Sequence, residues 1–394
     1  MTTVLDPPSP APPVPPAPAP TGRDHRGSWI PTGAMVRTRM MELRKRRGLM
    51  IAMAVVDIGI PVVFLGIRLI LHAAAPRTYG PAGGYDTFRA LVAILLYVFG
   101  FIVAATLGCT AGSSDLTDGM FRHLVVTGRS RVALYAARIP AGLAIVWTML
   151  GVGFAVVCAV CVFAAPASIN VNGADVPAGL SLAGFENWAA AHPDVALCDL
   201  PYPGPPDLMV ACGPNGPISV GVGGPGSATA PGVTTVPPAA QIRAAAIQAA
   251  LHTYGDYKRR FLYPSDGLMI RSGLWVELEA TVGFMVGLGL GSLLGQRTVS
   301  VVLMIVLELI LTPIFSRSDI PHLINGQRAV VGLAVAHLEP SGLGYVFGGG
   351  GGPNGNVGTS LLVPETRTVA VCVVAAWLVG WTILGAWRMA RRDA

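Results

Sequence analysis

The stretch LVAILLYVFGFIVAATLGCTA, residues 91–111, contains no charged side chain. A helix needs about 20 residues to cross the roughly 30 Å hydrocarbon core of a bilayer. The stretch is therefore long enough for one complete crossing, and the hydrocarbon would solvate almost all of its side chains. It predicts a membrane-spanning helix.

The composition of the whole chain agrees with this prediction. Hydrophobic residues make up 52% of the sequence and charged residues only 12%, whereas about a quarter of the residues in a typical soluble domain are charged. The chain is thus expected to be an all-α integral membrane protein in contact with membrane lipid. Its net charge of +6 is attributed to arginines that orient the chain in the bilayer, not to a nucleic-acid partner.

Six apolar runs are long enough to span a membrane. The fifth is the shortest, and the first contains Pro61, which a membrane helix tolerates as a kink. The expected spans are Leu49–His72, Leu91–Ala111, Ala141–Ala165, Leu274–Leu294, Val299–Phe315 and Val369–Trp387.

Basic residues cluster at the span ends that would share one side of the membrane. They precede the first span, separate spans two and three, and follow the last span. The positive-inside rule makes this side the cytoplasm, so both termini are expected there. A cleavable signal peptide is not expected, because residues 1–33 form a Pro-rich tract typical of a disordered tail.

These spans divide the chain into regions. Residues 34–165 hold an amphipathic helix and spans one to three, with a cytoplasmic loop at 112–140. Residues 166–271 form a large Gly/Pro-rich extracytoplasmic loop or cap. Residues 272–394 hold spans four to six, a second extracytoplasmic loop at 316–367 and a short cytoplasmic C-terminus.

The motifs of common catalytic sites are missing from the sequence. The only lysines, Lys45 and Lys258, do not stand in a phosphate-binding Gly-Lys-Ser/Thr sequence. There is no His-Glu-x-x-His helix and no Gly-x-Ser-x-Gly turn. The chain is therefore not expected to be an enzyme, and we expect no cofactor and no metal site.

Three kinds of residue stand out within or beside the spans. Asp57 and Glu308 are ionisable groups inside predicted helices, where they either share hydrogen bonds between helices or line a translocation route. Gly283, Gly287 and Gly291 recur every four residues, a spacing that permits close helix packing. Outside the membrane, Cys198 and Cys212 lie in one Pro-rich loop, where a disulfide is expected.

The loop between spans two and three is unusually polar. Its sequence predicts a short helix with the apolar face Leu116, Met120, Phe121 and Leu124, ended by Gly128. It is either a helix that projects toward a partner or a solvated hairpin whose arginines only enforce topology.

Three stretches together resemble the type-2 ABC exporter permease family. They are MVRTRMMELRKRRG (35–48), DLTDGMFRHLVVTGRSRVALYAARIPA (115–141) and LGSLLGQRTVSVVLMIVLELILTP (290–313). The resemblance covers about residues 34–165 and 272–390, and its motifs are moderately specific. The large loop between spans three and four departs from the family pattern, so the substrate class does not carry over.

The resemblance implies a permease subunit of an ATP-driven exporter. Such a subunit pairs with a related or identical permease and binds a separately encoded ABC ATPase, which is consistent with the missing phosphate-binding loop. The segment that docks into the ATPase in this family corresponds to Asp115, Asp118, Gly119, Phe121, Arg122, Arg129 and Arg131. The alternatives are a secondary transporter that uses the intramembrane carboxylates, and a polytopic sensor or assembly protein.

Overall fold

The computed structural model describes thirteen parts of the chain. These are residues 30–75, 79, 82–117, 130–165, 168–171, 174–199, 208–213, 216–222, 239–261, 264–315, 324–340, 343 and 366–391. Within them, five helices are long and apolar enough to cross a membrane, so the chain is a multi-pass integral membrane protein. The five are Arg47–Ala74, Tyr85–Ser114, Arg131–Phe163, Asp266–Leu294 and Arg367–Arg391.

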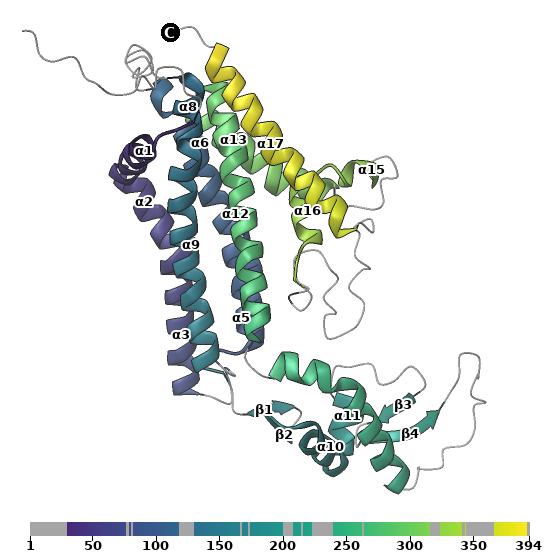
Figure 1. Ribbon diagram of the computed structural model, residues 1–394. Helices are drawn as coiled ribbons and strands as arrows, with labels where there is room; N and C mark the ends of the chain where they lie inside the picture. Colours follow the sequence, from purple (N-terminus) through teal and green to yellow (C-terminus); the bar gives the residue numbers. More distant parts are fainter. Residues whose placement is uncertain are drawn as a thin grey trace, which may run out of the picture.

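Several spans are built from consecutive helical elements (Figure 1). The first joins α2 (Arg47–Ala54), η1 (Val55–Gly59) and α3 (Ile60–Ala74). The second joins α5 (Tyr85–Ala90), η2 (Leu91–Phe99) and α6 (Gly100–Thr117). The third joins α8 (Arg131–Ala136) and α9 (Arg138–Phe163), while α12 (Asp266–Leu294) and α17 (Arg367–Arg391) are single helices.

The expected span Val299–Phe315 is not among the five. This part of the chain forms three short consecutive elements, α13 (Arg297–Ile305), η4 (Val306–Leu311) and α14 (Thr312–Phe315). The count of six spans is therefore not confirmed for the described residues. The helix α12 ends beside the last turns of α6, and α17 ends at the same side of the bundle. The chain must therefore run back toward the opposite side between the end of α12 and the start of α17.

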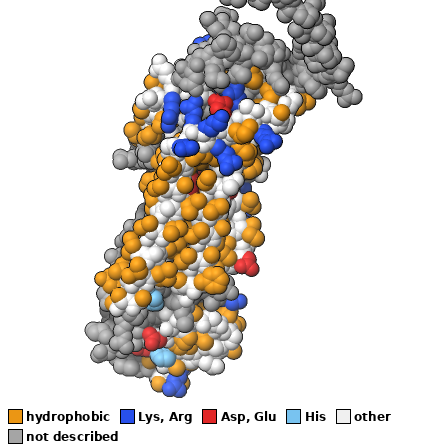
Figure 2. Space-filling model, turned by 90° about the vertical axis from the view of Figure 1, so that its left-hand side faces the viewer, with side chains coloured by type: hydrophobic (Ala, Val, Ile, Leu, Met, Phe, Trp, Pro, Cys, Tyr) orange, Lys and Arg blue, Asp and Glu red, His pale blue; other side chains and the backbone are white. Residues whose placement is uncertain are grey.

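Two ends of the helix bundle differ in charge. We call the end that carries α1 (Gly33–Lys45), α8 and the last turn of α17 the basic end, and the opposite end the cap end (Figure 1). Figure 2 shows Lys and Arg side chains gathered above a broad hydrophobic belt on the face of α1 to α3. Exposed apolar side chains of α3 contribute to this belt; they are Val62, Val63, Phe64, Ile67, Leu69 and Ile70.

The helices α6 and α12 form the central pair of the bundle. A Cβ atom on Gly291 of α12 would lie 2.5 Å from the carbonyl oxygen of Cys109, and one on Gly112 of α6 would lie 2.5 Å from that of Leu288. Glycines on both helices thus let the two backbones touch. The predicted glycine stripe faces α6 of the same chain.

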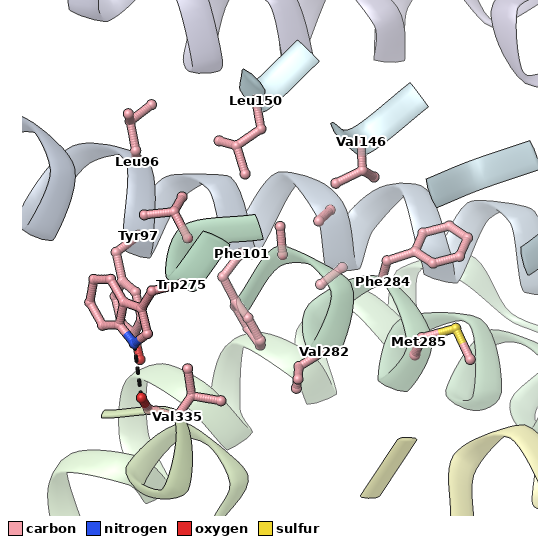
Figure 3. Close-up of a cluster of buried hydrophobic side chains, with 14 of the residues drawn as sticks. Leu96, Tyr97, Phe101, Val146, Leu150, Trp275, Val282, Phe284, Met285 and Val335 are labelled. Carbon is pink, nitrogen blue, oxygen red and sulfur yellow. Dashed lines mark hydrogen bonds between the residues drawn. The ribbon is translucent and has the colours of Figure 1, made fainter. Parts of the chain in front are cut away.

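Aromatic side chains continue this core toward the cap end (Figure 3). The rings of Tyr97 and Trp275 stack with centroids 4.3 Å apart. The Trp275 indole N–H donates to the carbonyl oxygen of Val335, at 2.9 Å. Val335 belongs to the short helix α16 (Val331–His337), which follows α15 (Ile324–Gln327) and is buried against α12 and α17. The bundle therefore encloses part of the predicted loop 316–367.

The cap is a folded unit and not only the irregular, Gly/Pro-rich loop that the sequence suggests. The strands β1 (Ser168–Val171) and β2 (Ala174–Pro177) pair antiparallel, as do β3 (Leu208–Gly213) and β4 (Gly216–Val222). Between and after these hairpins lie α10 (Leu182–Ala191), η3 (Val195–Asp199) and an Ala-rich helix, α11 (Ala239–Phe261).

Tyr257 of α11 holds the core of the cap together. Its ring stacks on Phe185 of α10, with centroids 4.2 Å apart. Its hydroxyl donates to the carbonyl oxygen of Pro177 at 2.5 Å and accepts the Leu180 N–H at 3.1 Å. Burial raises the pKa of the Tyr257 phenol, so its contribution to cap stability is present below the ordinary tyrosine pKa of about 10 and is lost at higher pH.

Replacing Tyr257 with phenylalanine is expected to loosen the cap and leave the bundle intact. Two partly buried backbone groups would lose their partner, at a cost of about 1–3 kcal/mol. Hydrogen exchange followed by mass spectrometry should show faster exchange in α10 and α11. The matched change Tyr79→Phe removes a hydroxyl from a half-exposed tyrosine and should alter nothing; equal exchange in the two variants would contradict the proposed role of Tyr257.

Candidate functional site

An amphipathic helix lies across the basic end of the bundle. The helix α1 packs against α9 and is separated from the first span at Arg46, whose backbone leaves the helical region with ψ of 70°. Arg39 and Leu43, four residues apart, are buried, whereas Arg37, Arg44 and Lys45 are exposed. Figure 1 shows α1 turned away from the direction of α2.

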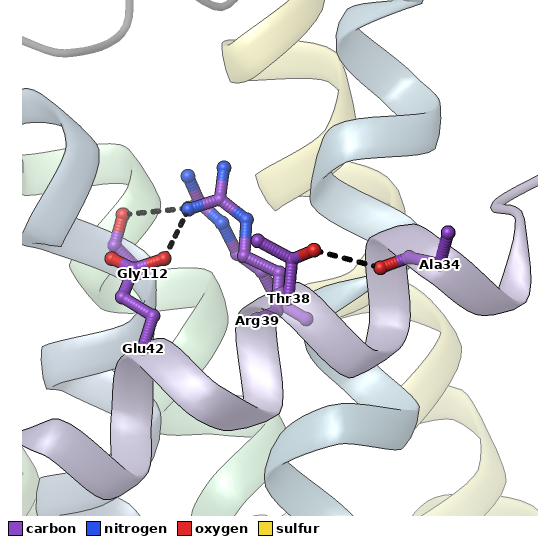
Figure 4. A network of polar contacts seen from close by, with 6 residues as sticks. Ala34, Thr38, Arg39, Glu42 and Gly112 are labelled. Atoms are coloured by element: carbon purple, nitrogen blue, oxygen red, sulfur yellow. Dashed lines mark hydrogen bonds and ion pairs between the residues drawn. The ribbon is translucent and has the colours of Figure 1, made fainter.

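Two arginines lie close together at this end, one on α1 and one on α9 (Figure 4). The Arg39 guanidinium forms an ion pair with Glu42 at 2.6 Å within α1. The Arg138 guanidinium donates to the carbonyl oxygen of Gly112, at 3.1 Å, and so ties the start of α9 to the last turns of α6. Arg39 and Arg138 line one small pocket together with Leu43 and Ser114.

A second contact joins α8 to the last span. The Arg131 guanidinium donates to the carbonyl oxygen of Ala390, at 3.3 Å. Four residues further along, Tyr135 packs so closely against Gly385 of α17 that a Cβ atom there would overlap its phenol. The two helical ends that flank the predicted coupling loop, at Thr117 and Arg131, are therefore both attached to neighbouring helices.

Most of the predicted coupling residues lie outside the described residues. Arg131 is described, and the backbone of Asp115 belongs to α6, although its side chain is not described. Asp118, Gly119, Phe121, Arg122 and Arg129 all fall in residues 118–129, between the described parts. Their expected contact with an ATPase stays a prediction.

One of the two predicted intramembrane carboxylates can be placed. Asp57 lies in η1 and is 3% exposed, and its Oδ1 atom has no hydrogen-bond partner within the described parts of the chain. The backbone of α9 approaches closely, because a Cβ atom on Gly153 would overlap the carbonyl oxygen of Asp57. Glu308 belongs to η4, but its side chain is not described.

Two further carboxylates within a span were missed at the sequence level. Glu277 and Glu279 lie in α12, inside the span Asp266–Leu294, and Glu279 is completely buried. The signal was present in the sequence, since WVELEA places both acids three or more residues inside the expected span Leu274–Leu294. Ionisable residues within a span are functional candidates by default.

The cysteines divide by location. Cys109, Cys158, Cys161 and Cys372 are free, whereas Cys198 is disulfide-bonded. The side chain of Cys212 lies outside the described residues, so its pairing with Cys198 stays a prediction.

Mass spectrometry of the protein digested without reductant should find a peptide pair joined through Cys198 and Cys212. A crosslink that closes a loop of this length typically stabilises a fold by about 2–4 kcal/mol. Alkylation of both thiols in the unreduced protein would contradict the pairing and would also argue against an extracytoplasmic cap.

Among the described residues, no group of three or more His, Cys, Asp or Glu side chains is arranged to hold a metal ion. No family model, curated protein or solved structure matches the chain.

Proposed function

We propose that this chain is the membrane-spanning permease subunit of an ATP-driven ABC exporter. The three stretches that resemble the type-2 exporter permeases support the proposal, as does the absence of a phosphate-binding loop from the sequence. In this proposal the basic end faces the cytoplasm of a bacterial cell, both termini lie there, and the cap lies outside the plasma membrane. A separate ATPase subunit supplies hydrolysis, and a second permease, identical or related, completes the complex.

The observation that carries the proposal is the attachment of both ends of the loop 118–129. On one side, Arg138 ties α9 to α6 next to α1. On the other side, Arg131 ties α8 to the end of α17. A force applied to the loop would therefore move several spans together, as transmission from an ATPase requires.

This attachment suggests how hydrolysis drives transport. Closure of two ATPase subunits around ATP would push the loop and shift the equilibrium between inward-open and outward-open arrangements of the spans. The central pair α6 and α12 would move as one body, because backbone contact along the glycines prevents the two helices from sliding independently.

Purification of the tagged chain from its native membrane tests the proposal. We expect a second protein with Walker A and B motifs to copurify and the complex to hydrolyse ATP. Purification of the chain without any nucleotide-binding partner, together with transport that does not depend on ATP, would contradict it.

A second candidate function is secondary transport coupled to protons. It is favoured by Asp57 and Glu277, each of which has a buried carboxylate oxygen without a hydrogen-bond partner among the described residues. Such groups can carry protons through a transporter. This candidate predicts that the purified chain alone transports its substrate in liposomes that carry a pH gradient.

A further inference from the structure

A pocket opens between α9 and α12 on the outer surface of the bundle. Its volume is about 260 Å³. Leu150 and Phe154 line it from α9, while Ile270, Leu274, Val276 and Glu277 line it from α12. Ile270 and Leu274 are 63% and 67% exposed, so the pocket opens toward the surrounding lipid. The carboxylate of Glu277 is the charged group in this otherwise apolar lining.

Two glycines lie beside the side chains that line the pocket. A Cβ atom on Gly151 of α9 would lie 3.3 Å from Glu277 Oε1, with no other heavy atom within 4 Å. Gly273 of α12 lines the pocket itself, and a Cβ atom there would lie 2.9 Å from the ring of Phe154. A larger residue at position 151 would therefore press on the carboxylate, and one at position 273 would press on the Phe154 ring.

The carboxylate of Glu277 has an unused acceptor. Its Oε2 atom is buried and has no hydrogen-bond partner among the described residues. The nearby Thr281 hydroxyl donates to the backbone oxygen of Glu277 at 2.7 Å and accepts the Trp147 indole N–H at 3.0 Å, so these contacts do not serve the carboxylate. An ionised group within a span is unfavourable, and a cationic ligand would offset that cost.

We infer that this pocket binds a lipophilic amine, a small molecule with an apolar body and one protonated nitrogen. The apolar side chains of α9 and α12 would cover the body, and the ammonium group would donate to Glu277. The lining residues include no basic side chain, which selects against an anion. The site is reached from the lipid and does not depend on an ATPase partner, so the inference stands apart from the proposed exporter function.

Binding of 1-adamantanamine to the full chain in lipid nanodiscs tests the inference, with 1-adamantanol as a neutral probe of nearly the same shape. Radiolabelled probes are measured against empty nanodiscs, which removes partition into lipid. Saturable binding of the amine is expected. The variant Glu277→Gln keeps the size of the side chain. It should lower the affinity for the amine by about tenfold or more and change the affinity for the alcohol by less than about twofold.

The variant Gly151→Leu provides a second test, because a leucine there would crowd the Glu277 carboxylate and compete with the ammonium group for it. It should weaken binding of the amine by about tenfold or more and still give a folded protein, since nothing except the Glu277 carboxylate lies near the added Cβ atom. The inference is overturned if the amine shows only unsaturable uptake, if Glu277→Gln binds it like the unmodified chain, or if Gly151→Leu binds the amine normally.

Discussion

Replacing Gly287 with leucine is expected to destroy the folded bundle. A Cβ atom at this position would overlap the carbonyl oxygen of Ala105, and a backbone atom cannot turn aside as the end of a flexible side chain can. The helices α6 and α12 would have to separate along their length, which uncovers the backbone contacts at Gly108 and Gly112 as well. We expect a loss of at least about 3 kcal/mol, the upper end of the usual cost of overpacking.

Size-exclusion chromatography after heating measures this effect in detergent. Gly287→Leu should give no monodisperse peak at temperatures that the unmodified chain survives. The control is Gly66→Leu, which makes the same change within the first span at a glycine with no neighbouring atom within 4 Å. If the two variants melted alike, the close contact between α6 and α12 would not be what holds the bundle together.

The same helices show what the sequence could and could not predict. The apolar runs located five of the spans because lipid accepts almost only such sequences, but the start of each of these spans was placed too far inside. The second span begins at Tyr85 instead of Leu91, and the third at Arg131 instead of Ala141. Arg138 lies outside the predicted span Ala141–Ala165, yet it is buried within the helix and donates a hydrogen bond to the carbonyl oxygen of Gly112.

Contacts between parts of the chain that are distant in the sequence could not be predicted from it. The glycine stripe of α12 indicated close packing, but no local pattern identifies α6 as its partner. In the cap, the hydrogen bond between Tyr257 and Pro177 joins residues 80 apart in the sequence. A local pattern cannot reveal such a contact, so the common core of the Ala-rich helix and the Gly/Pro-rich segment was not predicted. Glu277 is a different case, because its position within the expected span Leu274–Leu294 can be read directly from the sequence.

Replacing Phe121 with alanine is expected to release most of the ATPase from the complex. The predicted apolar face of the loop would fill a groove on the ATPase, and the largest aromatic side chain in such a groove typically contributes at least about 2 kcal/mol to binding. The amount of ATPase retained per permease after affinity purification should fall accordingly, about thirtyfold in affinity. The amount of permease in the membrane should stay near normal.

Phe163→Ala is the matched control for this variant. Phe163 ends α9 near the cap and is 89% exposed, so its loss should leave ATPase retention unchanged. Equal retention in Phe121→Ala and Phe163→Ala would remove Phe121 from the proposed interface.

The two arginines within residues 118–129 give a test that leaves the bundle contacts intact. Arg131 also bonds to Ala390 of α17, so its substitution would disturb both the loop and the bundle. Arg122 and Arg129 can be changed without removing that hydrogen bond. The control is reversal of the charges of Arg37 and Arg44, which are exposed on α1 at the same end of the bundle.

The most direct measurement of coupling to an ATPase is therefore the retention of the copurified ATPase, and its rate of ATP hydrolysis, in the double variant Arg122→Glu and Arg129→Glu. Like charges brought together at the interface should lower retention by about tenfold or more, with normal amounts of permease in the membrane and near-normal retention in the α1 control. Retention and hydrolysis equal to those of the unmodified chain would contradict the account, because the loop would then serve only as a topological hairpin.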